Sequence, residues 1–297
     1  MYKPVTQLSC MTLNMQYQQS FPGHYSASNP DYDSSNAPPN LTEQEEFLQK
    51  KFYDINHPHI LGVQECTHMT IEVLRRLGYD LVTDSYSSDT SMSVKDMVYN
   101  DNNVKESIYS TTYESHLFNA IFIHREVKLN YNILDKGYSR ISSTLNLDGS
   151  SGRSSGILAY RSVVWIRIQD KNTGQTYLIC NTHISGGRFE DLYFLQLLES
   201  GNERTKQIER VIEIANQNKD SDDIIIFMGD FNATPNYTNP SMVSYWKHVI
   251  SNNEGVRKDA IKFNIKDDTE LESKFMEHMI GPLRVLEVKG WYMLYNE

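Results

Sequence analysis

The feature that most constrains the fold of this chain is an uninterrupted apolar run, Ile224–Phe227, that leads into a short polar segment. Successive β-branched and aromatic residues without alternation are typical of a strand covered on both faces. Gly229 then allows the backbone to turn, and Asp230 and Asn232 follow in the sequence GDFNATP. In an extended chain these two side chains point the same way, roughly 7 Å apart, so a carboxylate and a carboxamide can face one ligand. Asp and Asn are also ordinary turn residues, so this motif alone leaves a turn and a binding site as alternatives.

Three other apolar runs end in polar side chains in the same way. Their polar residues are Asn14 in QLSCMTLNMQ, Gln64 and Glu65 in HILGVQE, and Asn181 and His183 in YLICNTH. A single Glu or His after a strand is more often solvated or structural than functional. In open α/β sheets, however, ligands bind beyond the carboxyl ends of strands. The repetition therefore favours one shared site.

The middle of the chain predicts an antiparallel hairpin. The run Ile157–Gln169 alternates in hydropathy, Lys171–Gly174 has turn residues, and Tyr177–His183 is again apolar. This hairpin places His183 at the far end of its second strand. With helical segments between other strands, periodicity alone predicts an α/β or α+β fold.

These segments resemble the motifs of the endonuclease/exonuclease/phosphatase superfamily of metal-dependent phosphodiesterases and phosphatases. The matches, in the family's order, are TLNMQ for its first Asn motif, GVQE for its metal-ligand Glu motif, NTH for its phosphate-contacting His motif and GDFNATP for its Asp-x-Asn motif. Asn119–Arg125 is similar to the family's middle strand, and Glu203–Gln217 to the helix before the Asp-x-Asn strand. The resemblance covers the chain from about residue 8 to about residue 236. It implies a four-layer α/β/β/α sandwich, in which two packed mixed sheets are flanked by helices.

The resemblance also implies a role for each polar residue. Glu65, with Asn14 beside it, would ligate Mg²⁺, or Mn²⁺ in its place, since such hard cations take oxygen ligands. Asp230 would orient or deprotonate the attacking water, Asn232 would hold the phosphate, and His183 would donate a hydrogen bond to a phosphoryl oxygen.

Two further residues are expected at the substrate phosphate. Asn181 belongs to the same NTH motif as His183, and Arg188 follows in the Gly-rich segment ISGGR. A guanidinium there can bind phosphate, although arginines of this kind more often lie on a solvated face.

The chain departs from the family after Gly281. Family members normally end in an Asp-His-type strand and a Ser-Asp-His motif, and the last residues, GWYMLYNE, contain neither. We therefore expect a single domain over residues 1–297 that is incomplete at its C-terminus. Without the terminal His, weak or absent catalysis is expected from these residues alone.

The function implied by the resemblance is that of a Mg²⁺-dependent phosphodiester hydrolase, in the first place a nuclease acting on nucleic acid. A lipid or inositol-phosphate phosphodiesterase or phosphatase is an alternative, as is a catalytically silent relative that binds a phosphorylated ligand or a protein. The net charge of −10 gives no overall field that attracts polyanions. Binding of nucleic acid would therefore require a local basic patch.

Cysteine use and hydropathy indicate the compartment. Cys10 and Cys180 lie within predicted strands and Cys66 follows Glu65, which favours buried thiols over a disulfide framework. The first residues, MYKPVTQ, lack the apolar core of a signal peptide, and no stretch is long and apolar enough to span a bilayer. We expect an intracellular protein, cytoplasmic or nuclear, that is not secreted.

Overall fold

The computed structural model describes residues 8–15, 41–54, 57–66, 68–85, 118–141, 161–184, 203–233, 243–244, 246–262 and 264–290. The chain divides into two compact units. Unit 1 consists of Met1–Arg140, Ser162–His183 and Ala215–Asp230, and unit 2 of Ile141–Arg161, Ile184–Ile214 and Phe231–Glu297. The expectation of one domain over residues 1–297 stays a prediction.

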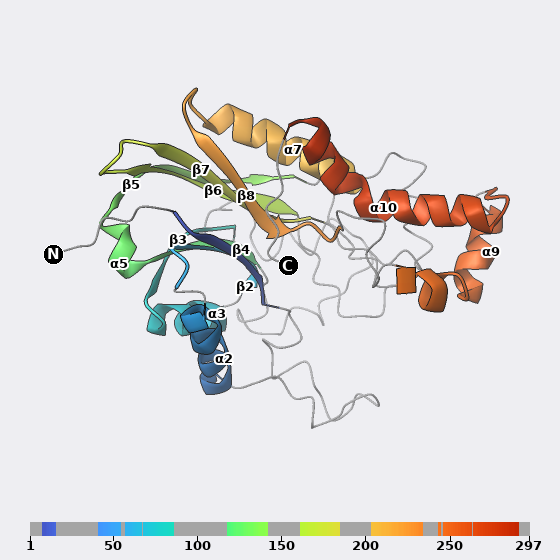
Figure 1. Cartoon of the computed structure of the whole chain (residues 1–297), viewed down its shortest axis with the longest axis horizontal. Coiled ribbons are helices and arrows are strands. Elements are labelled where there is room, and N and C mark those ends of the chain that lie inside the picture. The colour runs from blue at the N-terminus through green and yellow to red at the C-terminus, as the bar shows by residue number, and fades with distance from the viewer. Residues whose placement is uncertain are drawn as a thin grey trace, which may run out of the picture. The chain divides into compact units, whose positions relative to one another are not determined.

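Unit 1 contains two four-stranded sheets (Figure 1). The first has the order β1 (Cys10–Asn14), β2 (Ile60–Cys66), β4 (Phe118–His124) and β3 (Tyr79–Asp84). β1 runs parallel to β2, while β4 is antiparallel to both β2 and β3. The C-terminal ends of β1, β2 and β3 therefore lie at the same end of this mixed sheet. The expected middle strand at residues 119–125 is confirmed as β4.

The second sheet has the order β5 (Tyr131–Arg140), β6 (Ser162–Asp170), β7 (Thr176–His183) and β8 (Ile224–Asp230). β6 is antiparallel to β5 and β7, whereas β7 and β8 are parallel, with the Cα of His183 opposite that of Asp230. The predicted hairpin is confirmed, since β6 and β7 are joined through a turn at residues 171–173. His183 ends its second strand, as expected.

The two sheets pack on each other through their apolar faces. Ile60, Ile121 and Ile123 of the first sheet share one buried cluster with Ile166 and Ile179 of the second. Burying such side chains stabilises the fold by about 1.5–3 kcal/mol each. Gly62 permits the close approach, because a Cβ there would lie 2.8 Å from both Asn181 Oδ1 and Met228 Cε.

Helices cover the outer side of the sheets. Leu48 and Phe52 of α2 (Leu41–Asp54) and Leu74 of α3 (His68–Arg76) share a second buried cluster with residues of β2 and β4. Figure 1 shows α2 and α3 on one side of the first sheet. The short α5 (Arg125–Lys128) follows β4, and α7 (Glu203–Asn218), the expected helix before the Asp-x-Asn strand, has its last residues in unit 1. Two packed mixed sheets with flanking helices confirm the predicted fold class.

The expectation that Ile224–Phe227 is covered on both faces is wrong. Within the described strands β8 is an edge strand that pairs only with β7. Ile224 is 48% exposed and the next three residues are only partly buried, while Met228 is buried. An apolar run without alternation thus does not distinguish an edge strand from a central one.

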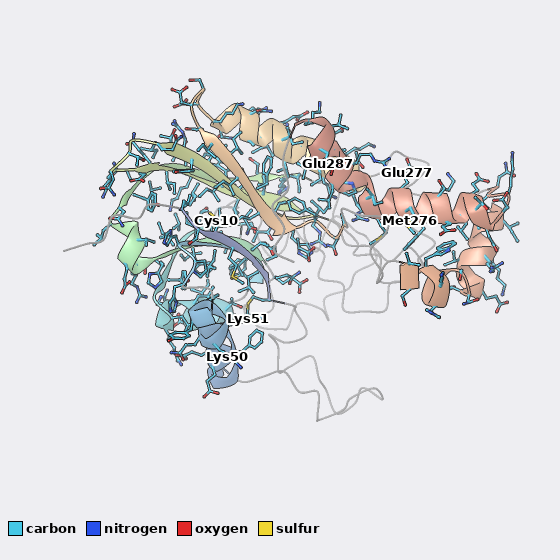
Figure 2. All side chains as sticks on the ribbon, viewed as in Figure 1. Cys10, Lys50, Lys51, Met276, Glu277 and Glu287 are labelled. Carbon is cyan, nitrogen blue, oxygen red and sulfur yellow. The ribbon has the colours of Figure 1, made fainter. Side chains whose placement is uncertain are left out.

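In unit 2 the regular elements described after β8 are all helical. They are the π-helix η5 (Trp246–Ile250), α9 (Glu254–Lys262) and α10 (Asp268–Val288). Trp246, Val256 and Phe275 form their common core. Asp267 begins α10 by accepting a 2.8 Å hydrogen bond from the amide of Glu270, and Figure 2 shows Met276, Glu277 and Glu287 along this helix.

The three cysteines all lie in the described part of the chain and are thiols that are not disulfide-bonded, as predicted. Cys10 lies on β1 (Figure 2), and burial raises its pKa to about 12 and also raises the pKa of Cys180. The thiols of Cys10 and Cys180 therefore stay protonated at neutral pH and are not nucleophiles. Among the described helices none combines the length and hydropathy needed to cross a membrane.

Candidate active site

Four of the expected residues lie at the carboxyl ends of strands in unit 1. Asn14 ends β1, Glu65 is next to last in β2, His183 ends β7 and Asp230 ends β8. Each sheet contributes one parallel pair, β1 with β2 and β7 with β8. Parallel strands deliver their ends to the same side of a sheet, which is where ligands of α/β proteins bind. We call these four side chains the polar edge.

Asn14 connects two carboxylates at the polar edge. Its Nδ2 donates a 2.6 Å hydrogen bond to Asp230 Oδ2 and a longer one, of 3.4 Å, to Glu65 Oε1. Asn14 and Asp230 are 216 positions apart in the sequence and belong to different sheets. The predicted convergence of these three residues is therefore present in the structure.

His183 completes the polar edge. Its Nε2 lies 3.8 Å from Asp230 Oδ2, a distance at which the two form an ion pair when the imidazole is protonated. The His183 side chain is 11% exposed and that of Asp230 is 30% exposed. The carboxylate can thus be reached by water or substrate while the imidazole is held mostly within the protein.

A local distortion of β2 turns the side chain of Glu65 toward Asn14 of the polar edge. The pairing of β2 with β4 shifts register between Val63 and Cys66, and Glu65 has a φ of 51°. A bulge inserts an extra residue and redirects its side chain, while left-handed backbone at a residue other than Gly costs about 1–3 kcal/mol. Such strain is concentrated at functional positions, in agreement with a binding role for Glu65.

Asn181 is buried between the two sheets. Its Nδ2 donates to the carbonyls of Val63 and Ala120, both at 2.9 Å, and its Oδ1 accepts a 2.5 Å bond from Gln64 Nε2. Both amide hydrogens are used inside the core. The expected contact of Asn181 with the substrate phosphate finds no support in this geometry, which gives the residue a role in joining the sheets.

Asn232 lies two positions beyond Asp230, in unit 2. It has a φ of 44°, and its Nδ2 donates a 3.2 Å bond to the carbonyl of Ile184. Its own main-chain carbonyl accepts a hydrogen bond from Arg204 Nη2. The other residue expected at the phosphate, Arg188, lies outside the described part of the chain.

The sequence motifs assigned no role to two polar residues that support the site. Gln64, 1% exposed, connects β2 to Asn181, and Arg204, 2% exposed, contacts the main chain that carries Asn232. A signal for Arg204 existed. Arg204 and Gln207 stand at i and i+3 before buried Ile208 and Val211, so the helical period places both polar residues on the buried stripe.

The oxygen donors of the polar edge fit a hard divalent cation. No group of three or more His, Cys, Asp and Glu side chains in the described part of the chain is arranged to hold a metal ion. Mg²⁺, however, usually keeps several waters and needs only one or two protein carboxylates. Glu65 and Asp230, both within hydrogen-bonding distance of Asn14, supply such a set.

Solved structures with similar folds were compared with the chain. A mannosyl-6-phosphatase of Bacteroides thetaiotaomicron is 18% identical with a TM-score of 0.47, over 82% of this chain and 72% of that one. An endonuclease/exonuclease/phosphatase family protein of the same organism is 17% identical with a TM-score of 0.46, over 82% of this chain and 69% of that one. D. rerio TDP2, complexed with a single-strand DNA product, is 15% identical with a TM-score of 0.45, over 76% of this chain and 61% of that one. No protein-family model and no curated protein matches the sequence.

With TM-scores below 0.5, the assignment of the fold depends on the strand order and packing described above. The two packed mixed sheets and the polar residues at their strand ends agree with what the sequence motifs implied. In its fold and its motifs the chain is similar to the endonuclease/exonuclease/phosphatase superfamily.

Proposed function

We propose that this chain is a Mg²⁺-dependent phosphodiester hydrolase whose substrate is a nucleic acid. The observation that carries the proposal is the environment of Asp230. Its Oδ2 accepts a 2.6 Å hydrogen bond from Asn14 and lies 3.8 Å from His183 Nε2. A carboxylate held between an amide donor and an imidazole at a partly open strand end suits the activation of water.

In this proposal each side chain has a defined task. Asp230 accepts the proton of the attacking water, and the bond from Asn14 fixes the direction in which the carboxylate faces. His183 donates from Nε2 to a phosphoryl oxygen as negative charge develops there. Asn232, from the loop after β8, donates to another phosphate oxygen.

Glu65 and Asn14 would hold the cation, and the nearby Asp230 carboxylate would help to balance its charge. A bound Mg²⁺ supplies positive charge that neutralises the phosphate and polarises its P–O bonds. The chain's own residues then need only to position water and phosphate, and no Ser or Cys nucleophile is required.

A nucleic acid is favoured by a basic group on β5. This strand runs parallel to β7, so Arg140, its last residue, lies at the same end of the sheet as His183. Arg140 Nε donates to Tyr138 Oη at 3.3 Å. A guanidinium group can bind phosphate, whereas the Tyr138 ring packs against the core between the two sheets. β5 is three strands from β8, or roughly 14 Å at the usual strand spacing, a distance that a polynucleotide covers and a small phosphomonoester does not.

The test is hydrolysis of bis-p-nitrophenyl phosphate with Mg²⁺ or Mn²⁺, comparing the wild type with Asp230→Ala and Glu65→Ala. Both substitutions are expected to abolish metal-dependent turnover. Glu213→Gln, a change on an exposed helix face, is the matched control and keeps wild-type activity. A folded, metal-loaded wild type without turnover would contradict the enzymatic proposal and leave a silent phosphate-binding protein.

The substrate class is tested in the same preparation. Single-stranded DNA, RNA, an inositol phosphate and sphingomyelin are offered at equal phosphate concentration. Faster cleavage of DNA or RNA supports the proposal. Faster cleavage of the inositol phosphate or of sphingomyelin would contradict it and favour a lipid or inositol-phosphate hydrolase.

A further inference from the structure

Arg204 is the largest fully buried side chain among the described residues, with 2% of its surface exposed. It is the second residue of α7. A guanidinium stays protonated in proteins, and burial of a charge is unfavourable unless polar groups surround it. The partners that surround this one are therefore informative about its task.

Two of those partners are consecutive main-chain carbonyls after β8. Arg204 Nη2 donates to the carbonyl of Phe231 at 3.3 Å and to that of Asn232. The first carbonyl belongs to the peptide plane before the Asn232 Cα, and the second to the plane after it. One nitrogen atom therefore fixes both planes whose orientations define φ and ψ of Asn232.

The backbone torsion at Asn232 needs such support. Its φ of 44° lies in the left-handed region, which residues other than Gly rarely adopt, although Asn does so more readily than most. The side chain of Asn232 is also held, because its Nδ2 donates to the carbonyl of Ile184. With the backbone held by Arg204, this bond to Ile184 sets the direction of the carboxamide.

We propose that Arg204 is a positioning residue that holds Asn232 in the left-handed conformation required for its contact with the phosphate. The role given to Asn232 rests on the function proposed above. The hydrogen bonds from Arg204 to the main chain do not depend on that function, and their effect is measured separately by hydrogen exchange.

The kinetic test is a double-mutant cycle with Arg204→Met and Asn232→Ala. A displacement of about 1 Å at a reacting group costs roughly 10²-fold in rate, so we expect Arg204→Met to lower kcat by about that factor with little change in KM. In the Asn232→Ala background the same substitution should lower kcat less than about 3-fold, because the group it positions is already gone. Arg210→Met, at an exposed arginine of the same helix, is the control and leaves kcat unchanged.

The structural test is hydrogen exchange without substrate. Arg204→Met should speed exchange at the amides of Phe231–Ala233, while those of Ile208–Ala215 in α7 stay as in the wild type. This result in an inactive protein would sustain the positioning role and reject the proposed function. Unchanged exchange at Phe231–Ala233, or a full additional loss of kcat in the Asn232→Ala background, would overturn the inference.

Arg204→Lys covers the case in which the Met variant does not fold. It keeps the charge but has a shorter side chain without the terminal Nη2 that donates to both carbonyls. We expect a folded protein whose kcat is at least 10-fold below the wild type. A Lys variant with wild-type kcat and wild-type exchange at Phe231–Ala233 would also overturn the inference.

Discussion

The carboxamides of Gln64 and Asn181 join the two sheets by a 2.5 Å hydrogen bond, and each residue lies close in its strand to a residue of the polar edge. Gln64 precedes Glu65 in β2, and Asn181 stands two positions before His183 in β7. A buried hydrogen bond between the sheets therefore fixes the strand segments that carry Glu65 and His183 of the polar edge.

The first prediction concerns this contact. Asn181→Ala removes the side-chain donors to the carbonyls of Val63 and Ala120 and one of the three acceptors of Gln64 Nε2. Each buried group left unpaired costs about 1–3 kcal/mol, so we expect the free energy of unfolding in urea to fall by about 3 kcal/mol. Asn132→Ala, at an exposed position on β5, should change it by less than about 0.5 kcal/mol. Equal effects of the two substitutions would refute the role of Asn181 in the core.

The second prediction concerns Gly229, the residue before Asp230. A Cβ at this position would lie 2.3 Å from the carbonyl oxygen of Thr182 on β7, and φ is 155°. Gly229→Ala must separate β8 from β7, and we expect a loss of at least about 2 kcal/mol in stability together with lower activity.

Gly174→Ala provides the matched control for that change. Gly174 also has a positive φ, 75°, but no atom lies within 4 Å of the added Cβ. Only backbone strain is expected there, about 1–2 kcal/mol, with activity retained. If Gly174→Ala reduced activity as much as Gly229→Ala, close packing beside Asp230 would not be the cause.

Much of this arrangement could be predicted from sequence, because local patterns carry it. The hairpin of β6 and β7 follows from periodicity and turn residues. The strand β4, the helix α7 and the roles of Asn14, Glu65, His183 and Asp230 follow from the resemblance of the motifs to the family. The position of β8 at the edge of its sheet could not be predicted, because it depends on which strands pair with each other. The apolar sequence around Ile224 would be equally suitable for a central strand.

Hydrogen-bond partners are also beyond local patterns. Asn181 and His183 belong to one motif, but only the packing of the sheets shows that Asn181 turns to two carbonyls of the first sheet. Likewise, the sequence shows Arg204 as one more charged residue on a helix. Its burial and its contact with Asn232 depend on where the loop after β8 passes.

The third prediction concerns Asn14. Asn14→Ala removes the hydrogen bond that orients Asp230, and misplacing a catalytic group by about 1 Å costs roughly 10²-fold in rate. We expect a decrease of that size in kcat for bis-p-nitrophenyl phosphate at saturating Mg²⁺, with unfolding in urea little changed because Asn14 is only partly buried. Asn132→Ala again serves as the control. A kcat within 3-fold of the wild type would show that Asp230 does not depend on Asn14.

The fourth prediction concerns pH and the histidines at the other end of the first sheet. Desolvation by burial lowers the pKa of His59 and of His124 below the ordinary value of 6.5. The charged groups beside His124 are Arg125, Glu126 and His57. The folded state binds fewer protons than the unfolded chain, so this contribution to stability is complete above pH 6.5 and is lost as pH falls through that value toward the folded pKa.

His124→Phe tests this effect while keeping an aromatic ring against Tyr79, whose centroid is 4.9 Å away. Urea midpoints measured at pH 5, 6, 7 and 8 should fall less steeply toward acid than in the wild type. Substitution of the exposed His248 by Asn should leave the slope unchanged. Parallel pH profiles for His124→Phe and the wild type would contradict the prediction.

The most direct measurement for the polar edge is a Mn²⁺ titration followed by electron paramagnetic resonance, on the wild type, Glu65→Gln and Asp230→Asn. These substitutions keep the shape of each side chain and remove only its charge. If the two carboxylates form one cation site, the wild type binds one Mn²⁺ that Mg²⁺ displaces, and each variant binds it at least 10-fold more weakly. Equal Mn²⁺ affinity in all three proteins would show that the carboxylates of the two sheets do not share a cation.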